Sequence, residues 1–191
     1  PDGNGGVIRR IVAIGGTMRP GSSTERALAV AAEAARDEGV EVVTFDGSYI
    51  AHLPHYRGPD WTEEKGREMI EAVRAADGLL LASPGYHGTV SGMVKNAIDY
   101  LEELANDRRP YLDGRPVGLI VTAFGHQAAN TGMTTLRTIA HALRGWPTPF
   151  GAAVKIGSDS FHENGACLDP TIQGQLELVG RQVAQAAGRF G

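Results

Sequence analysis

Five short apolar runs rich in strand-forming residues recur along the chain, and a segment with helical spacing follows each of them. This alternation is typical of a parallel sheet whose strands are joined by crossover helices. Two of the runs, 78–82 and 117–123, are apolar without interruption, as expected for strands covered on both faces. The sequence therefore predicts an α/β fold, with strands at residues 8–14, 41–45, 78–82, 117–123 and 152–156.

The helical segments each carry one apolar face. Asp169 followed by Pro170 predicts the start of the last helix, and Gly39 predicts the end of the first. The faces consist of Leu28, Ala31, Ala32 and Ala35; Met69, Val73 and Ala76; Met93, Ala97, Leu101 and Leu104; Leu136, Ile139, Ala140 and Leu143; and Leu176, Val179, Val183 and Ala187. With right-handed crossovers, these helices and strands build a three-layer, doubly wound parallel sheet of five strands, with the flavodoxin-like order 2-1-3-4-5. We expect a single domain over residues 7–191, after a flexible lead at residues 1–6.

Residues 15–24, Gly-Gly-Thr-Met-Arg-Pro-Gly-Ser-Ser-Thr, connect the first expected strand to the first helix. Their glycines allow close backbone approach, and their hydroxyls, the Arg19 guanidinium and the helix amides suit a phosphate group. A triphosphate loop is excluded, because Ser22 stands where that motif requires Lys, and the dinucleotide fingerprint is missing. The segment predicts a phosphomonoester site; the alternative is a strand-to-helix turn with a Ser/Thr cap.

Residues 83–92 follow the third expected strand and are rich in turn formers. Gly85 and Gly88 expose backbone amides, Tyr86 offers an aromatic surface, and His87 can donate or accept at a heterocycle edge. An ordinary turn followed by a core tyrosine is the alternative. Because the order of the strands reverses between the first and the third, the loops after them should meet and bind one ligand.

The two segments resemble the motifs of the NADPH-dependent FMN reductase family. Its phosphate loop reads G-S-x-R-x-x-S, and residues 16–22 match it with Thr17 in place of Ser. A second motif, S-P-E-Y-N-x-S-x-x-G-x-x-K-N-A-x-D, matches residues 83–99, with Gly85 for Glu and His87 for Asn. Residues 53–56, Leu-Pro-His-Tyr, resemble the family's L-P-x-Y segment. The resemblance covers at least residues 8–99.

The resemblance implies an FMN site with three parts. The phosphate would be held by Thr17, Arg19, Ser22, Ser23 and Thr24, and the isoalloxazine would lie along Pro84, Gly85, Tyr86, His87 and Gly88. A third contact is expected after the fourth strand, at Phe124, Gly125 and His126. Because FMN supplies the redox chemistry, we expect no catalytic acid, base or nucleophile. His52 and His55 lack an obvious third ligand, so no metal site is expected either.

The implied function is an FMN-dependent NAD(P)H oxidoreductase that transfers hydride from NADPH or NADH to flavin. The acceptor would be free flavin, for a partner monooxygenase, or a small quinone or azo compound. A non-enzymatic FMN electron carrier is the alternative, although such proteins are expected to be more acidic than a formal net charge of −4. A flavin-free scaffold that keeps only the phosphate loop is a third. The resemblance also implies a homodimer or a homotetramer.

Composition limits the partners and the compartment. Basic residues are scattered rather than clustered, which excludes a nucleic-acid face, and no apolar run approaches the length of a membrane span. Cys167 is the only cysteine, so an internal disulfide is impossible and a reducing compartment fits. We therefore expect a cytoplasmic protein that binds small molecules.

Overall fold

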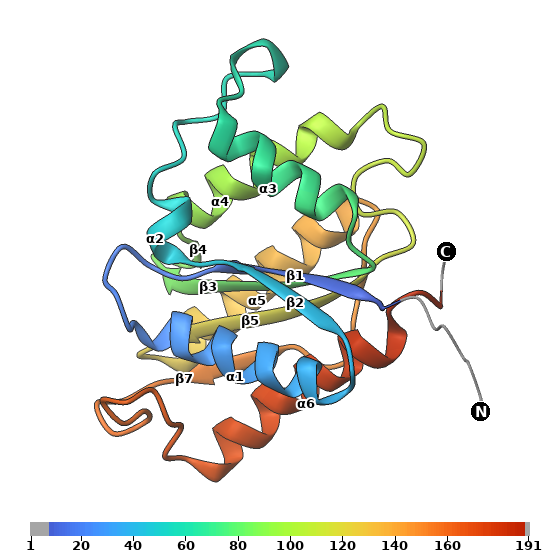
Figure 1. The fold of residues 1–191 in the computed structure, drawn as a ribbon. Coiled ribbons are helices and arrows are strands. Elements are labelled where there is room, and N and C mark those ends of the chain that lie inside the picture. Colours follow the sequence, from blue (N-terminus) through green and yellow to red (C-terminus); the bar gives the residue numbers. More distant parts are fainter. Residues whose placement is uncertain (1–7, 190–191) are drawn as a thin grey trace, which may run out of the picture.

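The computed structural model describes residues 8–189, in which a twisted parallel sheet separates two helical layers (Figure 1). The predicted lead at residues 1–6 lies outside the described residues. The principal strands are β1 (Arg10–Gly15), β2 (Glu41–Phe45), β3 (Gly78–Tyr86), β5 (Pro116–Ala123) and β7 (Ala152–Lys155). They lie in the order β2-β1-β3-β5-β7, all neighbours being parallel. Counted among the five expected strands, this is the predicted order 2-1-3-4-5.

The fifth expected strand, at residues 152–156, is found as β7, and a short strand that was not predicted precedes it. A short strand, β6 (Trp146–Pro147), pairs with the start of β5, and β7 pairs with its end. Between them lies Pro149, which has no backbone N–H to donate to the neighbouring strand. The register also shifts, because Val117 of β5 pairs with Pro147 and Ile120 pairs with Ala152, so the segment between β6 and β7 carries two more residues than the facing part of β5.

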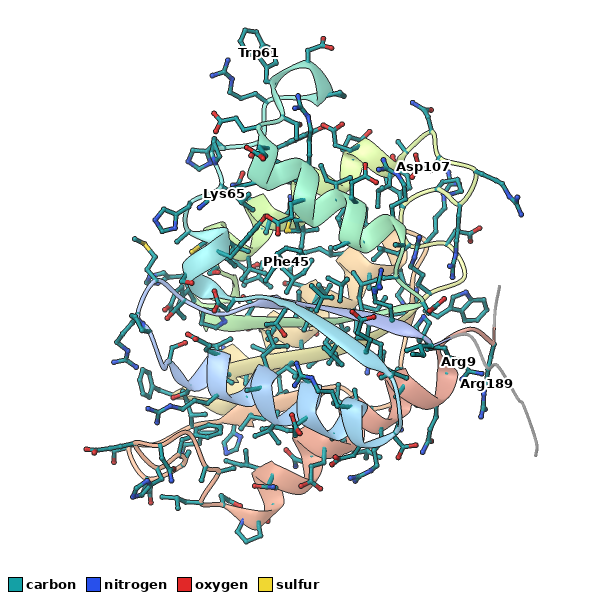
Figure 2. The ribbon with its side chains drawn as sticks, viewed as in Figure 1. Arg9, Phe45, Trp61, Lys65, Asp107 and Arg189 are labelled. Atoms are coloured by element: carbon teal, nitrogen blue, oxygen red, sulfur yellow. The ribbon has the colours of Figure 1, made fainter. Side chains whose placement is uncertain are left out.

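Residues that alternate along β1 pack into opposite layers, as expected for a pleated strand. Ile11 and Ala13 join the core beneath α1 (Ser23–Asp37) and α6 (Pro170–Ala186). Val12 and Ile14 join the core beneath α3 (Glu64–Arg74), α4 (Gly92–Asp99) and α5 (His126–Ala142). Figure 2 labels Phe45 at the end of β2, in this second core. The predicted three layers are confirmed.

The two predicted helix boundaries are also found. The Asp169 side chain accepts hydrogen bonds from the first turn of α6, and Pro170 is its first residue. Gly39 follows the end of α1 with a left-handed φ of 83°. The third expected helix is different, because α4 ends at Asp99 and continues as a 3-10 helix, η2 (Tyr100–Leu104).

Besides β6, three short elements were not predicted: α2 (Gly47–Ile50), the 3-10 helix η1 (Pro59–Trp61) and strand β4 (Thr89–Val90). None is long enough to develop a hydrophobic period. Trp61 in η1 is stacked against the Arg57 guanidinium, and Figure 2 shows it at the end of a projecting segment, on the α3 side of the sheet.

The buried Arg115 ties together the amino-terminal side of the sheet. Its guanidinium donates hydrogen bonds to the carbonyl oxygens of Ala76, Tyr111 and Arg74 at 2.9, 2.7 and 2.9 Å. Burial lowers the pKa of this guanidinium to about 10, so the side chain remains charged at neutral pH. The planar fork of arginine reaches three carbonyls at once, which a lysine ammonium cannot reproduce in this geometry.

We predict that Arg115→Lys destabilises the protein by about 2–3 kcal/mol, because two of the three buried or partly buried carbonyl groups lose their donors. The measurement is the free energy of unfolding in urea. Arg108→Lys, a change at an exposed position, is the control and should shift stability by less than about 0.5 kcal/mol. Equal stabilities for the two variants would contradict the assigned role.

Candidate functional site

The segment between β1 and α1 folds as a tight turn that ends at a helix cap. The Ser22 N–H donates to the carbonyl oxygen of Arg19 at 3.2 Å, with Pro20 and Gly21 at the centre of the turn. Gly21 has a φ of 65°, a left-handed conformation that few residues other than glycine adopt readily. The Ser22 hydroxyl then accepts from the Glu25 N–H, so Ser22 is the N-cap of α1. Ser22 therefore acts as a helix cap, which was the alternative role considered for this segment.

Capping leaves other donors of this segment free. In the part of the chain that the structure describes, the amides of Ser23 and Thr24 have no hydrogen-bond acceptor, as is usual in a first helical turn. The Arg19 side chain is exposed and makes no ion pair with any described residue. The Thr17 hydroxyl accepts from the Arg19 N–H at 3.2 Å and donates to the Arg19 carbonyl oxygen at 3.3 Å, which orders the loop. Amides, a guanidinium and hydroxyls thus converge at one helix N-terminus, where an anion is favoured.

The first residue of helix α2, Gly47, packs closely against this loop. A β-carbon on Gly47 would lie 2.0 Å from the Thr17 carbonyl oxygen, and one on Gly16 would lie 2.6 Å from the Gly47 nitrogen. Asp46 begins α2 by accepting hydrogen bonds from Tyr49 N–H and the Ser48 hydroxyl, and these bonds lower the pKa of its carboxyl. Asp46 is therefore a helix cap in this fold.

The segment expected to be a loop at residues 83–92 begins as a strand. β3 continues to Tyr86, reverses at His87 and Gly88, and pairs with β4 through Gly85–Val90 and Tyr86–Thr89. His87 and Gly88 have left-handed φ values of 49° and 84°, as in the two-residue turns that suit a hairpin. The turn-forming composition was correctly read at these two positions but hid the strand that precedes them.

The two segments line one cavity of about 370 Å³ at the carboxyl edge of the sheet, the left side of Figure 1. Its lining includes nine of the residues expected at the site: Thr17, Arg19, Ser22, Ser23, Thr24, Pro84, Gly85, Tyr86 and Phe124. Four others, His87, Gly88, Gly125 and His126, lie at the hairpin turn or at the start of α5 and do not line it. The expected convergence of the loops after β1 and β3 is present.

Three further residues of the lining were not expected: Thr122, Ala123 and Ile156. Thr122 and Ala123 end β5, so their place at the carboxyl edge of the fourth expected strand was the available signal. The Thr122 hydroxyl lies 2.7 Å from that of Thr24, and both side chains are buried. The site is therefore built from β1, β3 and β5 together.

A second hollow, of about 420 Å³, adjoins the first and shares Thr17, Arg19, Pro84 and Tyr86 with it. Its far side is formed by Met18 and by the first residues of α4 with their N-cap Ser91. Large apolar side chains stay exposed around the two hollows, with Met18 77% and Phe124 81% accessible. Exposed apolar surface beside polar groups is typical of a site that receives a ring.

A family model described as NADPH-dependent FMN reductase matches residues 9–159. The chain belongs to this family. An FMN-dependent NADPH-azoreductase of Staphylococcus aureus (strain USA300) is 32% identical over 107 residues, which are 56% of this chain and 53% of that protein. The chain thus spans about half the length of the curated relatives that it matches.

Solved structures of related fold extend over nearly the whole chain. The flavoenzyme NAD(P)H:(acceptor) oxidoreductase of Paracoccus denitrificans has a TM-score of 0.76 at 19% identity, covering 94% of this chain and 100% of that one. An NADH:FMN oxidoreductase in its apo form has a TM-score of 0.72 at 20% identity, covering 94% and 90%. At these identities, the likeness confirms the flavodoxin-like fold. Among the described helices, none is long and apolar enough to cross a membrane.

Two departures from the FMN reductase motifs, at positions 87 and 85, have a local explanation. At position 87, where the family commonly has Asn, the turn needs a left-handed φ, and Asn and His tolerate it better than most residues. At position 85, a β-carbon would lie 2.8 Å from the carbonyl oxygen of Ala128. The family's usual Glu therefore has no room here, because α5 begins directly against β3.

We predict that Gly85→Ala destabilises the protein by about 1–2 kcal/mol, because α5 or β3 must shift to accept the added carbon. The control is Gly174→Ala in α6, where an added β-carbon meets nothing within 4 Å. That change should instead stabilise the helix by about 0.5–1 kcal/mol. Thermal and urea unfolding compare the two; a neutral Gly85→Ala would contradict the close approach.

The carboxyl group of Glu25 lies close to the amide of Gly21, in the turn between β1 and α1. Burial and then Asp46 raise the pKa of this carboxyl above 4.5, while the Gly21 amide and Arg26 act in the opposite direction. The folded protein therefore holds the proton of Glu25 more tightly than the unfolded chain does.

This difference predicts how stability depends on pH. Well below pH 4.5, Glu25 is protonated in both states, and its contribution to stability is fully present. As the pH rises, the unfolded chain loses this proton first, so the wild type loses stability relative to Glu25→Gln until the folded carboxyl has also ionised. Urea unfolding of both proteins from about pH 4 to about pH 7 measures the difference. A wild type that gains stability relative to the variant would contradict the prediction.

Proposed function

We propose that this protein is an FMN-dependent NAD(P)H oxidoreductase, which reduces a small acceptor at the cleft formed by β1, β3 and β5. The observation that carries the proposal is the meeting of a donor-rich helix N-terminus and an apolar, aromatic wall in one cavity. Membership of the FMN reductase family supports it, and so does the similarity to a protein named as an FMN-dependent NADPH-azoreductase.

The residues present fit FMN at both of its ends. The amides of Ser23 and Thr24 and the Arg19 guanidinium suit a phosphate dianion. Pro84, Tyr86 and Phe124 offer flat or apolar surface for the isoalloxazine. His87, Gly88, Gly125 and His126 lie outside the cavity lining, and their contact with the outer edge of the ring remains part of the proposal.

When bound, FMN would accept a hydride from NADPH or NADH and pass reducing equivalents to the acceptor. The residues that line the two hollows include no carboxylate, imidazole or thiol. Their task would be to hold the cofactor and to leave one side of its ring accessible. The second hollow, with Met18, Tyr86 and Met93 in its lining, is a suitable place for nicotinamide and acceptor to bind in turn.

The acceptor and the assembly belong to the proposal as well. Azo compounds, quinones and free flavin are the acceptor classes we propose, with a flavin-dependent monooxygenase as a recipient of reduced flavin. A homodimer or a homotetramer is proposed, and an apolar groove that includes Ile98, Ile139 and Leu143 is one surface open to it. A cytoplasmic location remains a prediction.

One experiment separates the three candidate functions. The purified protein is loaded with FMN and its visible spectrum is recorded anaerobically before and after addition of NADPH or NADH. The proposal predicts one FMN per chain, loss of the flavin absorbance band, and its return when an azo dye is added. Bound FMN that neither nicotinamide reduces would indicate the electron carrier, and failure to bind FMN would indicate the scaffold.

We predict that Arg19→Ala weakens FMN binding by about 10- to 100-fold, the usual effect of losing charge-assisted hydrogen bonds. Binding of riboflavin, which has no phosphate, should stay within about twofold. Arg108→Ala, at an exposed position outside the cavity lining, is the control. Unchanged FMN affinity in Arg19→Ala, measured by titration of flavin fluorescence, would contradict the phosphate assignment.

A further inference from the structure

Thr24 and Thr122 form a buried pair of hydroxyl groups in the wall of the cavity. Thr24 is the second residue of α1, and Thr122 lies next to the last residue of β5, 98 positions further along the chain. Their hydroxyl oxygens are 2.7 Å apart, and each residue is only 2% exposed. Both residues line the cavity that we propose for FMN.

The pair shares one hydrogen bond, and its direction is open in the absence of a ligand. Each hydroxyl has a single proton and can accept two hydrogen bonds. If Thr122 donates to Thr24, the proton of Thr24 is free to point into the cavity. If Thr24 donates instead, its proton lies in the hydrogen bond to Thr122 and is not available to a ligand.

An anion at the N-terminus of α1 would select the first direction. The amides of Ser23 and Thr24 have no acceptor among the described residues, so an anion that binds them lies beside the Thr24 side chain. Such an anion only accepts hydrogen bonds, and it would therefore take the Thr24 proton. Thr122 would then donate to Thr24, and hydrogen bonds in such a chain strengthen one another.

We propose that Thr122 is a positioning residue for the phosphate of FMN, acting through Thr24. Thr122 holds the Thr24 hydroxyl in the rotamer that directs its proton to the phosphate, and β5 thereby contributes to recognition of a group bound at the start of α1. This inference rests on the proposed function. Other roles for Thr122, as a direct contact of the ribityl chain or ring or as a simple link between α1 and β5, make different predictions.

The test compares FMN with riboflavin, which shares the ring and the ribityl chain but not the phosphate. Dissociation constants of both flavins are measured with flavin-free protein by fluorescence titration. We expect Thr122→Val to weaken FMN binding by about 5- to 20-fold, the usual effect of one buried hydrogen bond, and riboflavin binding by less than about twofold. Thr122→Ser, which keeps the hydroxyl, should bind both flavins like the wild type.

Two further sets of variants complete the design. Thr148 is a buried threonine outside the cavity lining, with its hydroxyl bonded to the Phe150 carbonyl oxygen at 3.1 Å. Thr148→Val should leave both affinities unchanged and so controls for the loss of a buried hydroxyl. In the pair Thr24→Val and Thr24→Val/Thr122→Val, the second change should cost less than about twofold in FMN affinity, because Thr122 acts only through Thr24. Thr122→Ala carries the same expectation as Thr122→Val if the valine variant does not fold.

The outcomes distinguish this inference from the proposed function. A wild type that does not prefer FMN to riboflavin overturns both. A wild type that prefers FMN, with a Thr122→Val variant that keeps the full preference, overturns only the role of Thr122. Equal weakening of both flavins also overturns it, because Thr122 would then contact the shared part of the ligand or support the fold alone.

Discussion

A side chain on Gly15 would place its β-carbon 2.1 Å from the carbonyl oxygen of Ala82, at the point where β1 ends beside β3. One residue later, Gly16 lies against Gly47 of α2 in the same way. No residue larger than glycine fits these positions without moving the backbone. The chain therefore leaves β1 close to the end of the sheet and enters α1 with its first amides facing the cavity. Every donor in the phosphate loop depends on this close approach.

The fold was largely predictable because burial on both faces leaves a clear mark in the sequence. The uninterrupted apolar runs of β3 and β5 and the apolar faces of five helices predicted the layers, and the strand order adopted from flavodoxin-like sheets is the one found. The end of β3 was not predictable in this way. Ser83, Pro84 and Gly85 have the composition of a loop, and they are held extended by pairing with β5 and β4. Such pairing is a long-range contact that local preference does not report.

The candidate site was predicted in part, and for similar reasons. The loop at residues 15–24 carries its chemistry in consecutive residues, so its composition alone predicted an anion site. Thr122 and Gly47 were missed, because each matters through a neighbour distant in the sequence: Thr24 for one and Thr17 for the other. His87, Gly88, Gly125 and His126 were expected at the ring from the family resemblance. The local backbone places them beyond the cavity lining.

The departures from the family motif leave the architecture of the site intact. Gly85 lies so close to α5 that an added β-carbon would be 2.8 Å from the Ala128 carbonyl oxygen, and His87 adopts the left-handed φ of the hairpin turn. What remains is a backbone frame with a few donors at one end and apolar surface at the other. Such a frame suits a cofactor that performs the chemistry itself.

A crystal structure of the protein with FMN tests this account most directly. The account predicts the phosphate against the amides of Ser23 and Thr24, with Arg19 beside it and the ring between Tyr86 and Phe124. Electron density for the phosphate anywhere other than the start of α1, or for the ring outside the cavity at the carboxyl edge of β1, β3 and β5, would contradict it.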